Sequence, residues 1–202
     1  MKTDSKTKFL DAALTVVRTK GYAATTVEDI CHEAGLTKGS FFHHFKSKEE
    51  LALLAAEHFA AMADQLFCSA PFNDLKDPLE RLLGYIDFRR EILRGETHEF
   101  TCLLGTMVQE THDTHPAIRE ACERGISSHA STLEQDIAAA KALYAPDAPW
   151  TVESLALFTQ AVLQGAFILA KAKQETDVAA ECVVHLRRYI ENQFAPLRTT
   201  EE

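Results

Sequence analysis

The sequence predicts an all-α protein with a small N-terminal unit of three helices and a larger helical body. Every long segment places apolar residues about 3.6 positions apart, and no segment alternates apolar and polar residues as a strand does. The chain has 202 residues, of which 46% are hydrophobic and 25% charged, with eight glycines and six prolines. This composition excludes disordered and collagen-like chains. We expect nine or ten helices in at most two domains.

Local capping signals place the first four helices. An apolar stripe over residues 9–17 predicts a first helix that ends at Gly21, because glycine takes left-handed conformations at low cost. Thr26 and Thr37 can each cap a short helix with a side-chain hydroxyl. Ser47 opens the capping box Ser-Lys-Glu-Glu at the start of a longer fourth helix.

The rest of the chain reads as a helical body behind a proline-bounded break at residues 71–78. We therefore expect an N-terminal domain at residues 1–50, a connecting helix at 47–68, and a body at 69–202. Apolar stripes predict the body helices at residues 79–86, 100–110, 118–137, 151–170 and 178–194.

Charge is distributed unevenly along the chain. The formal net charge is −9, but residues 1–50 hold eight Lys/Arg against seven Asp/Glu, so the acidic excess lies in residues 51–202. Residues 34–48 contain three lysines and two histidines and no acid. This segment is suited to a phosphate backbone, whereas the acidic body would repel one.

Two short helices joined by a tight turn at Gly35 have the layout of a helix-turn-helix, whose second helix enters the DNA major groove. Hydroxyl groups at the helix start suit phosphates, a glycine permits close backbone approach, and Lys38 and His43 can reach base edges. Phe41, Phe45 and His44 are expected mainly to pack against the first and fourth helices. The candidate DNA-binding residues are Thr26, Thr37, Lys38, Gly39, Ser40, Phe42, His43, His44 and Lys48.

Residues 21–51 resemble the DNA-binding signature of the TetR family of bacterial transcriptional regulators. The matching positions are Gly21, Thr25, Thr26, Ile30, Ala34, Gly35, Thr37, Gly39, Ser40, Phe41, His44, Phe45, Lys48, Glu49 and Leu51. The resemblance implies a homodimer that binds double-stranded operator DNA and is released by a small-molecule inducer. We expect a cytoplasmic protein, because no long apolar run and no apolar signal-peptide core is evident. It also implies that the last two long helices pack against their symmetry mates. Phe42 stands where the family usually has a tyrosine, so one phosphate hydrogen bond is lost.

The effector is poorly specified by the sequence. Phe88, Phe100, Met107, Phe158 and Phe167 are candidates to line an apolar pocket, although such residues at helical spacing are more often core. Cys102 is an alternative trigger, because some regulators similar in this segment sense electrophiles or oxidants with a cysteine at a helix start, where the thiolate is favoured. A small buried side chain is the more common role for such a thiol.

Other classes of function find less support. No nucleophile elbow, P-loop, zinc-protease motif or dinucleotide turn is present, so an enzyme or a helical carrier is the weaker alternative. The five cysteines are scattered, and His98, Glu110, His112 and His115 lack compact ligand spacing, so we expect no metal and no cofactor. We also expect no membrane partner, because no apolar run of about 20 residues is evident.

Overall fold

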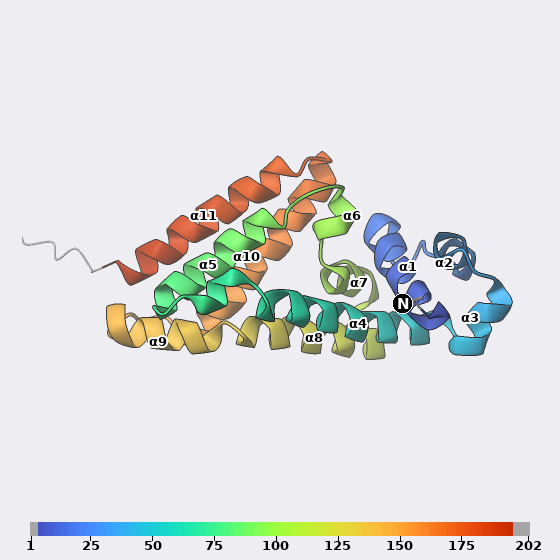
Figure 1. Cartoon of the computed structure of the whole chain (residues 1–202), viewed down its shortest axis with the longest axis horizontal. Helices are drawn as coiled ribbons and strands as arrows, with labels where there is room; N and C mark the ends of the chain where they lie inside the picture. Colours follow the sequence, from blue (N-terminus) through green and yellow to red (C-terminus); the bar gives the residue numbers. More distant parts are fainter. Residues whose placement is uncertain (1–3, 196–202) are drawn as a thin grey trace, which may run out of the picture. The chain divides into compact units, whose positions relative to one another are not determined.

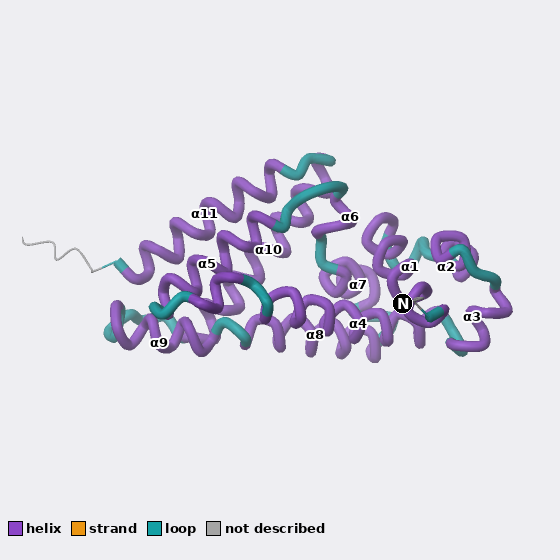
Figure 2. Tube along the Cα trace, viewed as in Figure 1, coloured by secondary structure: helices purple, strands orange, loops and turns teal. Residues whose placement is uncertain are grey.

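The computed structural model describes residues 4–195, and every regular element within them is a helix (Figure 1, Figure 2). These residues hold more helices than the nine or ten expected, because two predicted segments are each divided in two. The helices are α1 (Ser5–Lys20), α2 (Val27–Ala34), α3 (Lys38–His44), α4 (Lys48–Cys68), a 3-10 turn η1 (Pro71–Asp74), α5 (Pro78–Glu91), α6 (Thr97–Phe100), α7 (Leu103–Thr111), α8 (Pro116–Ser131), α9 (Glu134–Tyr144), α10 (Val152–Lys173) and α11 (Asp177–Phe194).

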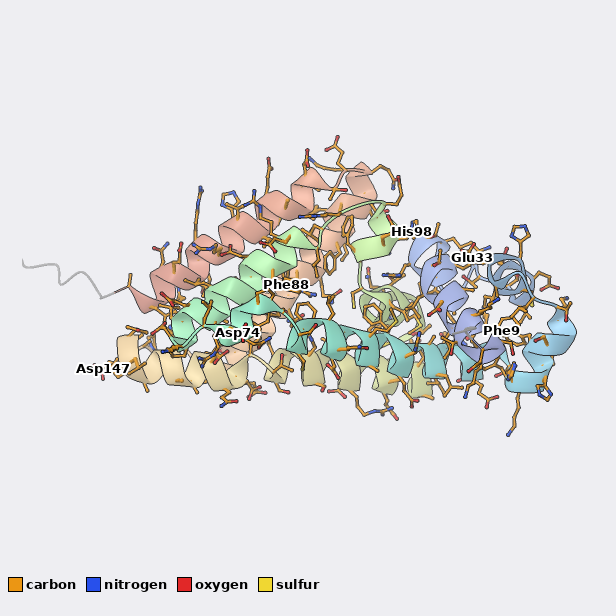
Figure 3. All side chains as sticks on the ribbon, viewed as in Figure 1. Phe9, Glu33, Asp74, Phe88, His98 and Asp147 are labelled. Carbon is orange, nitrogen blue, oxygen red and sulfur yellow. The ribbon has the colours of Figure 1, made fainter. Side chains whose placement is uncertain are left out.

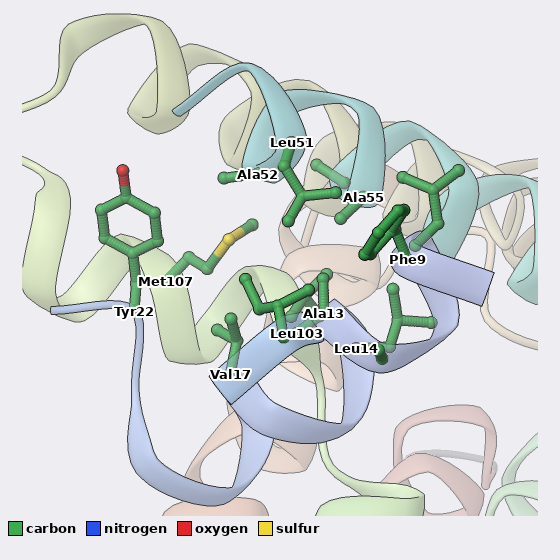
Figure 4. Packing of buried hydrophobic residues seen from close by; sticks show 14 of the residues in the cluster. Phe9, Ala13, Leu14, Val17, Tyr22, Leu51, Ala52, Ala55, Leu103 and Met107 are labelled. Carbon is green, nitrogen blue, oxygen red and sulfur yellow. The ribbon is translucent and has the colours of Figure 1, made fainter. Parts of the chain in front are cut away.

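Residues 4–67 and 96–127 form one compact unit, which we call the first unit. Its core joins the apolar faces of α1, α2, α3 and α4 to side chains from α7 and α8. Figure 4 shows α1 and α4 packed around this core together with Leu103 and Met107 of α7. Burial of this shared apolar surface is what holds the N-terminal helices in place.

Residues 68–95 and 128–195 form the second unit. Here α10 packs on α11, while α5 contacts both α9 and α11. Two arginine–carboxylate pairs tie these helices together: Arg81 of α5 to Asp136 of α9, at 2.5 Å, and Arg187 of α11 to Asp87 of α5, at 2.9 Å. The second unit is therefore a helical bundle with its own buried core.

This division into compact units differs from the sequence division at residues 68–69. Residues 96–127, which were assigned to the body, belong to the first unit because Leu104, Ile118 and Cys122 are buried in the core that α1 and α4 share. The functional division of the chain is a separate matter and stays a prediction.

The helix expected over residues 118–137 is interrupted between α8 and α9. The Ser131 hydroxyl donates to the Ser128 carbonyl, and the Thr132 hydroxyl donates to the His129 carbonyl at 2.7 Å. These side chains compete for carbonyls that a continuing helix would use, which accounts for the break at Ser131–Thr132.

The capping box expected at α4 is only half formed. The Glu50 N–H donates to the Ser47 hydroxyl at 3.1 Å, as expected of a cap. The Glu50 carboxylate, however, accepts from the Lys46 N–H at 2.6 Å and so reaches one residue beyond the cap position.

Two helices, α4 and α10, are long and apolar enough to cross a membrane by length and composition, with mean hydropathies of 1.2 and 1.5. The expectation that no such segment exists was therefore wrong by this measure. The observation is weak evidence for a membrane span, because core helices of soluble proteins pass the same test.

Candidate DNA-binding surface

The turn between α2 and α3 has the geometry of a helix-turn-helix. Thr26 and Asp29 form a reciprocal capping box at the start of α2, and Thr37 caps α3 by accepting from the Ser40 N–H at 3.2 Å. Gly35 ends α2 with φ 64°, ψ 33°, a left-handed conformation that side chains disfavour. Each of these three local predictions is confirmed.

A cluster of aromatic rings beneath α3 fixes its orientation. The Phe9 ring of α1 lies 5.5 Å from that of Phe41 and 5.9 Å from that of Phe45, both edge to face. His44 shares a 2.6 Å hydrogen bond with the Ser5 hydroxyl and lies against the Phe9 ring. The packing role expected of Phe41 and Phe45 is confirmed, and His44 has the same role in this structure.

The opposite face of α3 is exposed. Phe42 is 58% exposed, and Thr37, Lys38, Gly39 and His43 are exposed as well. Ser40 is half-buried. The exposed Phe42 ring is unusual for a large apolar side chain, which makes it a candidate contact surface rather than a packing residue.

Lys38 has a partner that the local sequence did not indicate. Its ammonium pairs with the Glu28 carboxylate of α2, and this pairing lowers the pKa of Glu28. Both side chains are more than half exposed, so water and salt screen the pair. Lys38 can therefore exchange this carboxylate for a DNA phosphate or a base edge.

Lys48 also has unexpected partners in place of open solvent. Its ammonium donates to the carbonyls of Tyr22, at 3.0 Å, and Thr25, at 2.9 Å, and lies 4.3 Å from the centroid of the Tyr22 ring. Partial burial lowers the pKa of Lys48. The side chain thereby holds the loop before α2 in place. Two of the three ammonium N–H groups are used in these bonds, and a contact of the third with a DNA phosphate stays a prediction.

The six effector-site candidates are divided between the two units. Each unit has a surface hollow, and none of the six candidates lines either of these two hollows. Phe88, labelled in Figure 3, Phe158 and Phe167 belong to the second unit. Phe100, Cys102 and Met107 belong to the first. Met107 is fully buried in the core of the first unit, and its contact with an effector stays a prediction.

Cys102 caps α7 and is half-buried. Its sulfur accepts from the Gly105 N–H at 3.4 Å. Next to it, the Arg18 guanidinium of α1 donates to the carbonyl of Thr101 at 3.4 Å and to that of Glu99 at 3.1 Å. Burial lowers the pKa of this arginine, a structural cation that the sequence analysis missed because its partners lie about 80 residues away.

Within residues 4–195, no three His, Cys, Asp or Glu side chains gather closely enough to hold a metal ion. Of the four residues considered for such a site, Glu110 accepts from the Ala23 N–H, and the His115 ring lies 5.3 Å from that of Tyr22. Both therefore contact the loop before α2.

Comparison with known proteins assigns both parts of the chain. Residues 9–55 match the N-terminal domain described as bacterial regulatory proteins, tetR family. Residues 78–182 match the C-terminal domain described as transcriptional regulator LmrA/YxaF-like.

Individual relatives agree with this assignment. The HTH-type transcriptional regulator LmrA of Bacillus subtilis is 29% identical over 66% of this chain and 71% of its own. The HTH-type transcriptional repressor KstR2 of Mycobacterium tuberculosis is 41% identical over 38% of each chain. Among the first curated relatives, the matched share of the relative's length runs from 25% to 94%.

A solved structure has the same fold. A TetR-family transcriptional regulator from Agrobacterium tumefaciens superposes with a TM-score of 0.79, covering 95% of this chain and 98% of its own at 20% identity. The relatives are regulators rather than enzymes. With its helix-turn-helix and both matched domains, this chain belongs to the TetR family of bacterial transcriptional regulators.

Proposed function

We propose that this chain is a cytoplasmic repressor that binds operator DNA as a homodimer and leaves it when a small molecule binds the body at residues 69–202. The observation that carries the proposal is the exposed face of α3, held on an aromatic base and bearing polar, cationic and apolar groups side by side. Such a face suits the major groove, where hydrogen-bonding groups and methyl groups alternate.

Each exposed group on α3 has a distinct role in this proposal. The Thr37 oxygen already accepts from Ser40, so its O–H proton is available to a phosphate oxygen. Lys38 and His43 donate to base edges or phosphates. Phe42 cannot replace the tyrosine hydroxyl, but its exposed ring suits apolar contact with a thymine methyl group. Lys46 is also exposed and adds a phosphate contact.

Dimerisation is proposed through α10. This helix leaves Leu157, Ile168 and Leu169 exposed, between 43% and 48%, and a side chain added at Gly165 would meet nothing within 4 Å. An exposed apolar stripe around a small residue suits close approach of the same helix from a second copy. Two recognition helices related by two-fold symmetry can then read half-sites about 34 Å or more apart.

Binding-site selection from random duplexes, followed by footprinting, tests the DNA proposal. We expect a pseudo-palindrome protected by a dimer. Lys38→Ala and His43→Ala should weaken binding and change base preference, whereas Lys76→Ala, an exposed lysine of the second unit, should do neither. Failure to select any sequence, or protection of one half-site by a monomer, would contradict the proposal.

The dimer interface has a matched control within the chain. Leu169→Glu should produce monomers in light scattering, because it places a charge on the proposed interface. Leu143→Glu on α9, where the native side chain is 63% exposed, should leave the mass unchanged. A dimer that persists in Leu169→Glu would move the interface away from α10.

For the effector, we rank an apolar or aromatic small molecule first and thiol modification second. Phe88, Phe158 and Phe167 are the lining candidates retained in the second unit. The thiol alternative rests on Cys102, which is half-buried at a helix start rather than sealed in the core. Operator release by an electrophile in wild type, and its loss in Cys102→Ser, would favour the second trigger.

A further inference from the structure

The loop that joins α1 to α2 is held by hydrogen bonds from side chains of two other helices, α4 and α7. From α4, the Lys48 ammonium holds the carbonyls of Tyr22 and Thr25. From the C-terminal end of α7, the Glu110 carboxylate accepts from the Ala23 N–H at 2.7 Å. The loop therefore has an anionic contact on its N–H side and a cationic contact on its carbonyl side.

Gly21 makes room for the Glu110 carboxylate. Its backbone has φ 88° and ψ 162°, a conformation that side chains rarely adopt. A β-carbon at this position would lie 2.0 Å from the Glu110 Oε1 atom and 2.9 Å from its Cδ atom. The contact thus depends on a glycine at the end of α1.

Glu110 and Lys48 also interact with each other electrostatically, and a ring contact lies beside them. The negative charge of Glu110 raises the pKa of Lys48 and so opposes the larger lowering caused by burial. The His115 ring, just beyond α7, lies 5.3 Å from the Tyr22 ring. Charge, hydrogen bonding and ring contact all connect the end of α7 to the same loop.

This loop leads directly into α2 and α3, the two helices of the helix-turn-helix. The buried Thr25 hydroxyl donates to the Gly21 carbonyl at 2.6 Å, and the next residue, Thr26, caps α2. Since Ile30 of α2 and Phe41 of α3 are buried in the same core, a displacement of α2 also moves α3.

We infer that Glu110 is a positioning residue for DNA binding, whose carboxylate transmits displacements of α7 through the Gly21–Thr25 loop to α2 and α3. The inference rests on the proposed operator binding and names the contact by which the first unit controls it. A movement of α7 that withdraws the carboxylate frees the Ala23 N–H, loosens the loop and lowers operator affinity.

Three variants of the full-length dimer separate hydrogen bonding from charge. Glu110→Ala removes both, whereas Glu110→Gln keeps an amide oxygen that can accept from Ala23 and removes only the charge. Glu120→Gln on α8 is the matched control, because it removes one exposed negative charge away from the loop. Glu110 is itself exposed, so we expect all three variants to fold.

The first measurement is amide hydrogen exchange at Ala23 in the protein without DNA. We expect exchange about tenfold faster in Glu110→Ala, with Glu110→Gln closer to wild type and Glu120→Gln unchanged. The second is affinity for the selected operator duplex. Loss of one net hydrogen bond in each protomer predicts weakening on the order of tenfold in Glu110→Ala, and less in Glu110→Gln.

Combining Glu110→Ala with Lys48→Met tests whether the Glu110 and Lys48 contacts act together on the loop. A loss of operator-binding free energy in the double variant that is smaller than the sum of the two single losses supports the inference. Unchanged exchange at Ala23 in Glu110→Ala overturns the contact, and faster exchange with unchanged operator affinity overturns the transmission. If wild type binds no duplex, operator binding itself fails, while the exchange measurement still reports on the contact.

Discussion

A half-buried histidine in the second unit should make the stability of this protein depend on pH. The Nε2 atom of His129, on α8, lies 3.0 Å from the Tyr85 hydroxyl oxygen, which accepts from the Gln160 side-chain amide at 3.2 Å. A neutral His129 ring can accept the Tyr85 proton at Nε2, and it then carries its own proton on Nδ1.

Burial and the nearby Arg89 cation lower the pKa of His129 from 6.5 to about 3. The unfolded chain consequently binds a proton here more readily than the folded chain does. Stability is complete above pH 6.5 and is lost as the pH falls from there toward 3. Between about pH 8 and pH 5, the free energy of unfolding should fall by about 2 kcal/mol from this group alone.

Urea denaturation at fixed protein concentration measures this loss. His129→Gln keeps an acceptor for Tyr85 but cannot titrate, so between about pH 8 and pH 5 wild type should lose about 2 kcal/mol more than the variant. His43→Gln, at an exposed position on α3, controls for removal of a histidine elsewhere in the chain and should follow wild type. Equal losses in wild type and His129→Gln would refute the lowered pKa of His129 in the folded protein.

Two further substitutions and one labelling experiment test the first unit. Gly21→Ala should destabilise the fold by about 1–3 kcal/mol in denaturant titrations, because the backbone conformation is strained for alanine and the β-carbon clashes with Glu110. Lys48→Met should weaken binding to all duplexes alike and speed amide exchange in the α1–α2 loop, since its ammonium holds two loop carbonyls; a change in base preference would contradict this. In the folded protein, an alkylating reagent should modify Cys102 long before Cys122, because Cys122 is fully buried and burial raises its pKa to about 12; mass spectrometry of peptides gives the order.

The DNA-reading helices could be predicted because their signals are local. A cap at Thr26, a left-handed turn at Gly35 and a cap at Thr37 each involve partners within a few residues. Phe41 and Phe45 could be assigned to packing from their helical spacing alone. Local hydrogen bonding and apolar period therefore determine this part of the fold strongly.

The partners of the lysines could not be predicted in the same way. Lys38 and Lys48 lie in a stretch without acids, yet Lys38 pairs with Glu28, and Glu110 acts on Lys48 from 62 positions along the chain. Glu110 meets Ala23 across a separation of 87 residues. Charge counted along the sequence says nothing about such contacts, which exist only after the helices pack.

Helix ends in the body were harder to place, although one carried a readable signal. The Ser131–Thr132 pair offers two hydroxyls to nearby carbonyls, and α8 ends there. Met107 illustrates the opposite difficulty, because a methionine at helical spacing looks alike whether it lines a pocket or fills a core. In this structure the packing of α7 against α1 buries Met107 in the core of the first unit.

The pairing of the lysines bears on how an acidic protein can read DNA. A reading surface with free lysines on a body of net negative charge would bind any duplex by charge alone, since phosphate contacts carry no sequence information. Here Lys38 already forms an ion pair with Glu28, and the Lys48 ammonium is hydrogen-bonded to the loop. When either lysine meets a phosphate of a random duplex, it exchanges one partner for another, so little binding free energy is gained. Thr37 and Lys46 are proposed to contact the phosphates of every duplex alike, so discrimination between sequences must come from groups that meet base edges, a role proposed for the exposed Phe42 ring and His43 imidazole on α3. Pairing within the first unit thus favours specific over nonspecific binding.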